Sequence, residues 1–464
     1  MMQQESGTIA AISTAMNPSG IGIVRMSGER SIEIADRVFK SIKGKKLREQ
    51  KSHTIHYGYI VDGEDTIDEV LVMLMKGPNS FTTEDTVEIN CHGGIFVVKK
   101  VLDLLIQNGA TPAEPGEFTK RAFLNGRLDL SQAEAVSDLI SSQNEYALKS
   151  SVSQLKGSLK EKIEKIRAEI MYDTAFIESA LDDPEHISLD ELPEKLAGEL
   201  DQWLEEITEL INSADNGKIL KEGVNTVILG KPNAGKSSLL NVMIEEERAI
   251  VTDIEGTTRD ALEEQINLNG VLLNIIDTAG IRQTDDKIEE IGVSKAKDYA
   301  NSADLILYVI DASRELDDND RDIMEMIEGK NTIILLNKSD LNMVLSEEVI
   351  KNNYFKDQDI KIIEISAKNN QGIKELEETI KNMFYEGNLA YNDQVYITNT
   401  RQKNELSKSK ESLLKVKESL EMAMPEDFLT IDLLDAYEHL GQITGEAIGE
   451  DLVNEIFRKF CMGK

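Results

Sequence analysis

The residues best suited to chemistry begin with a glycine-rich segment at 230–237, Gly-Lys-Pro-Asn-Ala-Gly-Lys-Ser. An apolar run precedes it and a helix-like segment follows, so we expect a loop between a strand and a helix. Such a loop turns its backbone N–H groups toward phosphates, while Lys236 supplies positive charge and the Ser237 hydroxyl can bind Mg²⁺. The helix N-terminus adds its dipole. We expect nucleotide contacts here from Asn233, Ala234, Gly235, Lys236, Ser237 and Ser238.

A second phosphate-sensing segment, Asp-Thr-Ala-Gly at 277–280, ends the apolar run at 272–276. A carboxylate at a strand end can make an outer-sphere contact to Mg²⁺, and the glycine can offer its N–H to a γ-phosphate. The loop at 252–260 lies where a GTPase needs a threonine for Mg²⁺, although spacing alone does not say which threonine. We expect contacts from Thr252, Asp253, Ile254, Glu255, Gly256, Thr257, Thr258, Asp277, Thr278, Ala279 and Gly280.

Two further segments predict guanine recognition. The apolar run at 332–336 leads into Asn-Lys-Ser-Asp, and the run at 361–365 leads into Ser-Ala-Lys. Asp340 can accept two hydrogen bonds from the guanine N1–H and exocyclic amine, which adenine cannot donate. The expected contacts are Asn337, Lys338, Asp340, Ser366, Ala367 and Lys368. All four segments in this order predict that the chain binds and hydrolyses GTP.

One residue of this GTPase pattern has an unusual identity. Directly after the Asp-Thr-Ala-Gly segment, where Ras-like enzymes carry a glutamine that orients water, the chain has Ile281. An isoleucine side chain cannot position water, so the catalytic carboxylate or amide must come from elsewhere in the sequence.

Composition indicates a cytoplasmic protein of several domains. The chain has 464 residues, no signal-peptide pattern at its start and no apolar run near the roughly 20 residues of a membrane span. Its two cysteines, Cys91 and Cys461, form no disulfide or zinc pattern. A net charge of −34 argues against wrapping nucleic acid by electrostatics alone. The chain has two basic stretches, 43–48 and 401–417. Stretches of this kind are more often solvated faces than binding sites.

The order of predicted elements gives a multidomain α/β and α+β fold. Residues 1–120 are predicted to form an α+β domain, with strands near 21–25 and 70–75 and a helix at 95–107. Residues 121–222 and 387–464 are predicted to form the two parts of one helical bundle, into which a Ras-like P-loop GTPase domain, 223–386, is inserted.

Within the bundle, the sequence predicts a long helical stretch from 130 to about 180, opened by a capping box of Ser131 and Glu134. Further helices are predicted at 189–214, 399–422 and 431–460, and the GTPase domain is expected to end with a helix at 374–384.

Three segments together resemble one protein family. These are the loop Gly-Thr-Thr-Arg-Asp at 256–260, the segment Pro-Gly-Glu-Phe-Thr-Lys-Arg-Ala-Phe-Leu-Asn-Gly at 115–126, and the ending Phe-Cys-Met-Gly-Lys at 460–464. With a GTPase domain inserted in a helical bundle, they resemble the MnmE (TrmE) tRNA-modification GTPases over essentially the whole chain. One departure is Met462, where the family usually has isoleucine; the swap conserves apolar volume.

The resemblance implies a homodimer formed through N-terminal domains that hold a one-carbon carrier, 5-formyl- or 5,10-methylene-tetrahydrofolate. It also implies a partner flavoprotein with FAD (MnmG, GidA), which together with this chain adds a carboxymethylaminomethyl group to C5 of the wobble uridine of certain tRNAs. The partner would supply most of the tRNA-binding surface. The alternative is a regulatory or ribosome-assembly GTPase without RNA chemistry. A basic tail would favour that alternative, whereas this chain ends in an acidic helix and a cysteine.

The resemblance also assigns roles residue by residue. In the GTPase domain it places K⁺ at Asn233, Thr252, Ile254 and Thr257, Mg²⁺ at Ser237 and Thr258, and the water-orienting carboxylate at Glu289, with its neighbour Glu290 as the competing candidate. For folate it assigns Arg25, Glu88, Arg127 and Lys464. Cys461 would then lie near the one-carbon group, where a thiol could act as nucleophile or acid.

Overall fold

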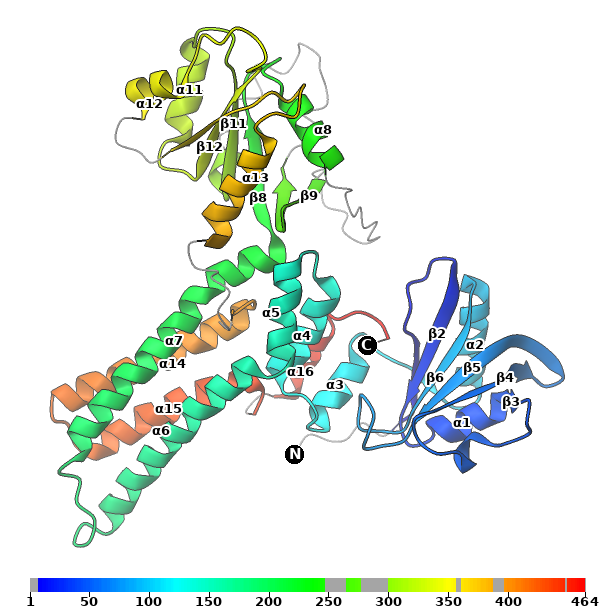
Figure 1. Cartoon of the computed structure of the whole chain (residues 1–464). Coiled ribbons are helices and arrows are strands. Elements are labelled where there is room, and N and C mark those ends of the chain that lie inside the picture. The colour runs from blue at the N-terminus through cyan, green and yellow to red at the C-terminus, as the bar shows by residue number, and fades with distance from the viewer. Residues whose placement is uncertain are drawn as a thin grey trace. The chain divides into compact units, whose positions relative to one another are not determined.

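The computed structural model describes residues 7–246, 264–276, 299–355, 360–386, 396–446 and 449–463. The chain forms two compact units (Figure 1). The first comprises Met1–Ser141, Ser151–Glu209 and Arg401–Lys464, and the second comprises Ser142–Ser150 and Leu210–Thr400.

A seven-stranded sheet with strand order β3-β4-β5-β6-β2-β1-β7 forms the N-terminal part of the first unit. Its paired neighbours are antiparallel, except that β1 and β7 run parallel. The strands are β1 (Ile9–Ile12), β2 (Ser19–Ser27), β3 (Phe39–Ser41), β4 (Thr54–Asp62), β5 (Asp65–Met75), β6 (Thr86–Gly93) and β7 (Thr111–Pro112). The short 3₁₀ helix η1 is Leu47–Glu49.

Helices α1 (Ser31–Val38) and α2 (Ile95–Gln107) cover one face of this sheet and share its apolar core. On β6, Val87, Ile89 and Cys91 lie in that core. Because side chains alternate along a strand, Glu88 and Asn90 lie on the opposite face. The sheet therefore has a helix-covered inner face and an outer face that carries polar groups. The predictions of strands near 21–25 and 70–75 and of a helix at 95–107 are confirmed.

The helical part of the first unit is built from long antiparallel helices. Its helices are α3 (Glu117–Leu124), α4 (Leu130–Ser141), α5 (Glu145–Leu155), α6 (Ser158–Asp182), α7 (Leu192–Glu222), α14 (Thr400–Glu421), α15 (Glu426–Thr444) and α16 (Glu450–Phe457), of which α5 and α7 extend into the second unit. Trp203 of α7 is fully buried and donates its indole N–H to Glu169 at 2.7 Å.

The helical stretch predicted from 130 to about 180 is helical but divides into three helices, α4, α5 and α6. The side chain of Asn144 accepts from the N–H of Ala147 and starts α5, and Gly157 takes a left-handed φ of 98° before α6. The predicted capping box is also displaced. Asp129 accepts from the N–H of Gln132 at 2.8 Å, and the Gln132 side chain accepts from the Asp129 N–H at 3.0 Å.

Two other helix boundaries differ from the prediction. Helix α7 runs to Glu222 rather than ending near 214, and it includes Gly217, whose missing Cβ would lie 2.0 Å from the Ile397 carbonyl. That glycine serves a close approach of backbones and does not end the helix. The predicted helix at 431–460 begins earlier, at Glu426, and is interrupted at Gly445, which has a left-handed φ of 93°.

A six-stranded sheet with order β13-β12-β11-β8-β10-β9 forms the centre of the second unit. The strands are β8 (Val224–Leu229), β9 (Glu264–Leu268), β10 (Val271–Ile275), β11 (Leu305–Asp311), β12 (Thr332–Asn337) and β13 (Lys361–Glu364). All neighbours are parallel except β9, which is antiparallel to β10. The carboxyl ends of β8, β12 and β13 therefore meet at one edge of the sheet.

Helices cover both faces of this sheet. Apolar residues of α8 (Lys236–Glu246) and α13 (Ile373–Lys381) belong to one core cluster, and those of α11 (Asp318–Ile327) and α12 (Glu347–Tyr354) belong to another. A π-helical turn, η2 (Asn382–Glu386), follows α13. This layering is the predicted α/β fold of a P-loop GTPase domain, and the multidomain fold class is confirmed.

Candidate functional site

The glycine-rich segment forms the turn between β8 and α8, as predicted. Gly230 has φ of 148°, and a Cβ there would lie 2.4 Å from the Val309 carbonyl oxygen. Gly235 has φ of 101°, and a Cβ would lie 2.0 Å from the Asn337 amide nitrogen. Both glycines are required because a side chain at either position would collide with the neighbouring strand end.

Lys236 opens α8 and lies over this turn. Its ammonium donates to the carbonyl oxygens of Gly230 at 2.7 Å and Lys231 at 2.8 Å, and burial lowers its pKa. Ser237 and Ser238 occupy the first turn of the same helix, with Ser237 half-buried and Ser238 exposed. Positive charge, helix N-terminus and a hydroxyl therefore converge at one point, an arrangement suited to phosphate oxygens.

Asn337 joins the phosphate-binding turn to a base-recognition loop. It ends β12, is buried, and donates its side-chain amide to the Ala234 carbonyl at 2.8 Å. Its amide oxygen accepts from the N–H of Ala367 at 3.1 Å. One side chain thus fixes the spacing of three loops that sequence reasoning predicted to meet.

Asp340 lies at the same edge and presents an exposed carboxylate. The Ser366 hydroxyl donates to its Oδ1 at 2.7 Å, and this hydrogen bond holds the pKa of Asp340 below its usual value. The N–H of Ser339 donates to the Ile365 carbonyl at 3.1 Å, which ties the two base-recognition loops together. An ionised, oriented carboxylate is what acceptance of two guanine hydrogen bonds requires.

Sequence reasoning missed β11 and the aspartate that ends it. Asp311 Oδ2 accepts from the Lys338 ammonium at 2.6 Å. Burial raises the pKa of Asp311, but hydrogen bonds from Lys338 and Ser313 outweigh burial, so its pKa is lowered. The apolar run at 305–310 ending in an aspartate was the available signal, because it repeats the pattern of the other strand ends.

A second missed interaction anchors the phosphate-binding turn. The Lys231 ammonium forms ion pairs with Asp317 and, at 3.0 Å, with Asp320. Asp320 is almost fully buried and also accepts from Arg314 at 3.1 Å. Lys231 is therefore used to hold the turn against the start of α11, and it is Lys236 whose ammonium lies within the turn.

Several predicted residues lie outside the described part of the chain, and their roles stay predictions. These are Thr252, Asp253, Ile254, Glu255, Gly256, Thr257, Thr258, Asp277, Thr278, Ala279, Gly280, Glu289 and Lys464.

In the first unit, Arg25 and Glu88 are directly opposite each other on β2 and β6. The Arg25 Nε donates to Glu88 Oε1 at 2.7 Å, with both side chains largely but not fully buried. The Arg25 guanidinium also lies 5.7 Å from the centre of the Phe118 ring. These two residues, predicted only from a family resemblance, form one ion pair on the outer face of the sheet.

The end of the chain reaches this ion pair. The Gly463 carbonyl accepts from Arg25 Nη1 at 3.2 Å and from the Ser13 hydroxyl at 3.0 Å. Gly463 has φ of 80°, and a Cβ there would lie 2.2 Å from the Ile12 carbonyl oxygen. Two residues earlier, the carbonyl of Cys461 accepts from the Gly116 N–H, and the Cys461 side chain is exposed. Cys461 therefore lies two residues before the carbonyl that accepts from Arg25.

Arg127 is connected to this region through aromatic residues. Its Nη1 donates to the Phe81 carbonyl at 2.7 Å, and its guanidinium lies 4.8 Å from the centre of the Phe81 ring. Phe81 packs against the apolar cluster that contains Phe118, the ring over which Arg25 lies. No direct contact between Arg127 and Glu88 appears among the interactions of the described residues.

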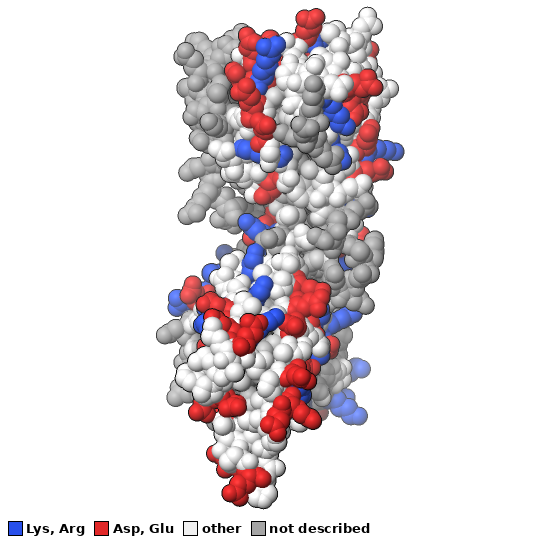
Figure 2. Space-filling view, turned by 90° about the vertical axis from the view of Figure 1, so that its left-hand side faces the viewer, with Lys and Arg blue, Asp and Glu red and all other residues white. Residues whose placement is uncertain are grey.

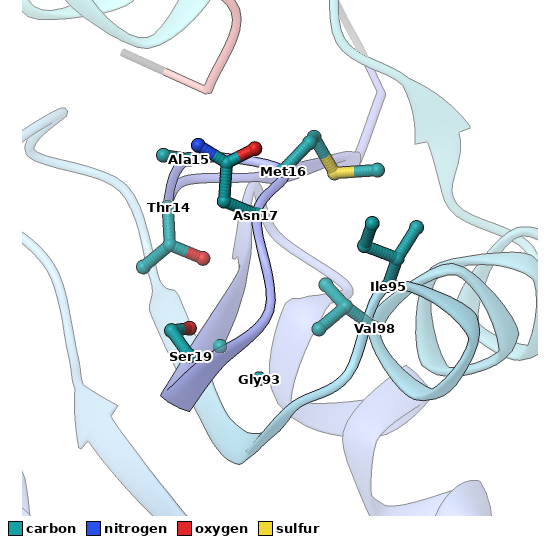
Figure 3. Close-up of a pocket in the computed structure, with 9 residues that line it drawn as sticks. Thr14, Ala15, Met16, Asn17, Ser19, Gly93, Ile95 and Val98 are labelled. Atoms are coloured by element: carbon teal, nitrogen blue, oxygen red, sulfur yellow. The ribbon is translucent and has the colours of Figure 1, made fainter.

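A small pocket lies between the loop that joins β1 to β2 and the first turns of α2 (Figure 3). Thr14, Asn17 and Ser19 supply polar groups to it, and Ile95 and Val98 supply apolar ones. Its lining contains none of the residues predicted for folate, so the pocket is not the site that the sequence indicated.

The basic stretch at 401–417 is largely neutralised by carboxylates. Arg401 pairs with Glu134 at 2.9 Å, and Lys417 pairs with Asp201 at 2.6 Å. Lys408 and Lys415 form similar pairs along α14. On the face drawn in Figure 2, the described Lys and Arg side chains are interspersed with Asp and Glu and form no continuous basic surface.

Comparison with known proteins identifies two family profiles along the chain. A profile described as the GTP-binding protein TrmE N-terminus matches residues 8–127, and one described as the MnmE helical domain matches residues 130–461. A tRNA modification GTPase MnmE from Lachnoclostridium phytofermentans is 56% identical over 461 residues, covering 99% of this chain and 100% of that protein. Another, from Clostridioides difficile strain 630, is 49% identical and covers 98% of this chain and 99% of that protein.

Among solved structures, a single-residue variant of Aquifex aeolicus Era bound to GDP and AlF₄⁻ aligns with 41% of this chain and 67% of that chain. The sequences are 28% identical in the alignment, and the TM-score is 0.27, too low to support an argument about the fold.

In the part of the chain that the structure describes, no helix combines the length and apolar character needed to span a membrane.

Proposed function

This chain belongs to the MnmE family of tRNA modification GTPases, and from this premise we propose a specific reaction for it. The chain binds and hydrolyses GTP. We infer that hydrolysis is activated by K⁺ and serves the addition of a carboxymethylaminomethyl group to C5 of the wobble uridine of certain tRNAs. In this proposal a flavoprotein partner (MnmG) supplies FAD, a tetrahydrofolate supplies the one-carbon unit, and the reaction takes place in the cytoplasm.

The observation that carries the nucleotide part is the position of Asn337. Its hydrogen bonds to Ala234 and Ala367 hold the phosphate-binding turn and the guanine-binding loop at one sheet edge. Asp340 lies on the intervening loop with its carboxylate oriented by Ser366. A guanine base and its phosphates can therefore be bound at once, with specificity from Asp340 and charge neutralisation from Lys236.

The residues of the phosphate-binding turn and of the first turn of α8 are suited to bind the two proposed cations, Mg²⁺ and K⁺. Ser237 follows Lys236 in the first turn of α8, where a hydroxyl can ligate Mg²⁺, and Thr258 is the second proposed ligand. Asn233 is exposed at a left-handed position of the turn, with φ of 62°, and its amide oxygen is available as a hard ligand for K⁺. Bound there with Thr252, Ile254 and Thr257, K⁺ would supply charge neutralisation at the β- and γ-phosphates.

The K⁺ proposal is tested by measuring GTP turnover in K⁺ and in Na⁺. We expect stimulation by K⁺ that is lost in Asn233→Ala, while Pro232→Ala, an exposed neighbouring residue, keeps it. Equal turnover in the two salts, or stimulation that survives in Asn233→Ala, would contradict the assignment of K⁺.

The outer face of the N-terminal sheet supports the folate proposal. A pterin presents a donor pair like that of guanine, and the Glu88 carboxylate can accept from it. Arg25, Arg127 and Lys464 would contact the remaining polar and anionic groups, of which Arg25 already contacts both Glu88 and the chain end. Cys461, exposed on that end, is then near the one-carbon group, where it would act as nucleophile or acid.

The same sheet face supports a homodimer through the N-terminal domains. Ile55, Tyr57 and Leu71 are all exposed there, with Tyr57 directly opposite Leu71 and Ile55 directly opposite Met73. Met73 in turn is opposite Glu88. An apolar patch next to the ion pair is typical of a surface covered by a protein partner.

Reconstitution tests the full proposal. The purified chain, the flavoprotein, unmodified tRNA, GTP, K⁺, a methylene-tetrahydrofolate and glycine should together produce the modified uridine, detected by mass spectrometry of nucleosides. The folate supplies the methylene carbon, and glycine supplies the amine nitrogen and the carboxymethyl carbons. Omitting either protein or the folate should abolish the product. A product that forms without this chain would overturn the proposed role.

A further inference from the structure

Helix α15 carries an apolar surface that the helical bundle does not use. Phe428, Ile431 and Leu434 follow one another at helical spacing and are 48%, 64% and 37% exposed. Met422 and Met424, in the turn between α14 and α15, are also exposed. We call these five residues the α15 apolar surface.

A different face of this helix packs into the bundle. Leu429, Leu433, Ala436 and Leu440 of α15 are buried. The Ser409 hydroxyl of α14 donates to the Ala436 carbonyl, which fixes the two helices against each other. Since an amphipathic helix needs one apolar stripe to join its bundle, the second stripe serves something outside the bundle.

The charges that α15 itself brings to this surface are all negative, while Lys415 of the neighbouring α14 lies close enough to Asp432 to oppose the rise of its pKa. Helix α15 contains five carboxylates, Glu426, Asp427, Asp432, Asp435 and Glu438, and neither lysine nor arginine. Asp427, Asp435 and Glu438 are exposed on the same side as the apolar residues, and burial raises the pKa of Asp432. The rim that α15 contributes is therefore acidic around an apolar centre, with Lys415 of α14 as a cation beside it, and a charged rim around an apolar centre is the anatomy of a protein interface.

This charge pattern favours one kind of partner for the α15 apolar surface over the others. RNA is repelled by an acidic rim. A second copy of the chain would bring two acidic rims together, which costs free energy because like charges would be desolvated side by side. A protein whose apolar contact surface is edged with lysine and arginine matches both the centre and the rim. The two methionines suit such a contact because their flexible side chains adapt to the partner surface.

We propose that the α15 apolar surface docks a basic protein partner, and that this partner is the tRNA-binding flavoprotein. The inference rests on the proposed function, in which a chain with net charge −34 must leave the recognition of tRNA phosphates to a basic partner. The GTPase residues lie elsewhere, so changes on α15 leave basal GTP hydrolysis intact.

Calorimetric titration of the full chain with the purified flavoprotein tests the proposal. We expect Ile431→Asp to weaken binding by about tenfold or more, since central apolar residues dominate interface energetics. Ile42→Asp, a change of similar exposure in the N-terminal domain, should bind like the wild type. Asp427→Lys with Glu438→Lys should slow association and reduce its dependence on salt. Circular dichroism and basal GTP hydrolysis verify that each variant is folded.

The outcomes separate this inference from the proposed function. If wild type binds the flavoprotein and Ile431→Asp binds equally well, the docking surface is overturned and the proposed function stands. If wild type does not bind it at all, the partner assignment fails and the docking proposal fails with it. Loss of self-association in Ile431→Asp, seen by sedimentation, with flavoprotein binding unchanged, would assign the surface to a second copy and contradict the proposal.

Discussion

The nucleotide edge of the six-stranded sheet and the outer face of the N-terminal sheet are assembled in different ways. At the nucleotide edge the functional residues lie at the ends of parallel strands or in the loops that follow them, and Asn337 joins neighbouring loops. At the outer face the Arg25–Glu88 ion pair joins two antiparallel strands, and the chain end at Gly463 completes the cluster. The first arrangement follows from strand order and the second from register and from a terminal segment 438 residues away.

This difference explains why the residues of the nucleotide edge can be predicted from local sequence motifs, whereas those of the outer sheet face cannot. Strand-end loops carry their functional residues in contiguous motifs, because the turn itself forms the site. A cross-strand pair has no such motif, since Arg25 and Glu88 are ordinary strand residues until their register is known. The following predictions test whether the two regions act as the separate sites that this comparison describes.

The largest effect is expected at the base reader of the nucleotide edge. The Asp340→Asn substitution replaces a carboxylate, which accepts hydrogen bonds, with an amide, whose NH2 group can donate one. That donor suits the O2 of xanthine rather than the amine of guanine. The preference between GTP and XTP should change by roughly 10³-fold or more. Nucleotide competition measurements verify it, with Asp311→Asn as the control that weakens both nucleotides alike. A variant that still prefers GTP would remove Asp340 from base recognition.

The next effect concerns the attacking water. Because Ile281 cannot orient water, we expect Glu289→Ala to lower kcat by about 10²-fold with little change in nucleotide affinity. Single-turnover hydrolysis and fluorescent nucleotide binding measure the two quantities separately. Glu290→Ala is the matched control and should retain turnover. If the control loses activity and Glu289→Ala does not, the two assignments must be exchanged.

At the outer sheet face, Glu88→Gln should weaken binding of a formyl-tetrahydrofolate by at least about tenfold, because a neutral amide loses charge-assisted hydrogen bonds. GTP hydrolysis should be unchanged if the two regions are separate. Glu69→Gln places the same change on another carboxylate of this face and should bind folate normally. Calorimetry with undiminished folate affinity in Glu88→Gln would exclude that residue.

The two cysteines should differ in their reactivity toward an alkylating reagent. Cys461 is exposed and should be alkylated by iodoacetamide, whereas Cys91 is buried and its pKa is raised to about 11 from 9.0, first by burial and then by Asp68. Its thiolate is therefore disfavoured in the folded state, so Cys91 contributes stability below pH 9 that is lost as pH rises toward 11. Peptide mapping after labelling should find Cys461 alone modified. Labelling of Cys91 at an equal rate would contradict its burial.

Replacement of Cys461 tests whether its thiol takes part in tRNA modification. Cys461→Ser should abolish tRNA modification and leave GTP hydrolysis near the wild-type rate, because a hydroxyl is a much weaker nucleophile than a thiolate at neutral pH. Full modification by this variant would remove the thiol from the reaction.

The sequence predicted the fold class and the nucleotide edge because both depend on local patterns. Apolar runs followed by glycine, asparagine or serine identified the ends of β8, β12 and β13. It did not reveal the Lys338–Asp311 ion pair or the anchoring of Lys231 by Asp320, since both join segments distant in sequence. The helical stretch predicted from 130 to about 180 also ran through 142–144 and 156–157, where the cap of Asn144 begins α5 and the left-handed Gly157 precedes α6.

Mass spectrometry of wobble uridines tests the central claim most directly. In a strain that lacks this chain, the carboxymethylaminomethyl group at C5 should disappear from the tRNAs that carry it, and the wild-type gene should restore it. Lys236→Ala should fail to restore it, because the lysine ammonium at the phosphate-binding turn is required for GTP hydrolysis. Unchanged modification in the deletion strain would contradict the account.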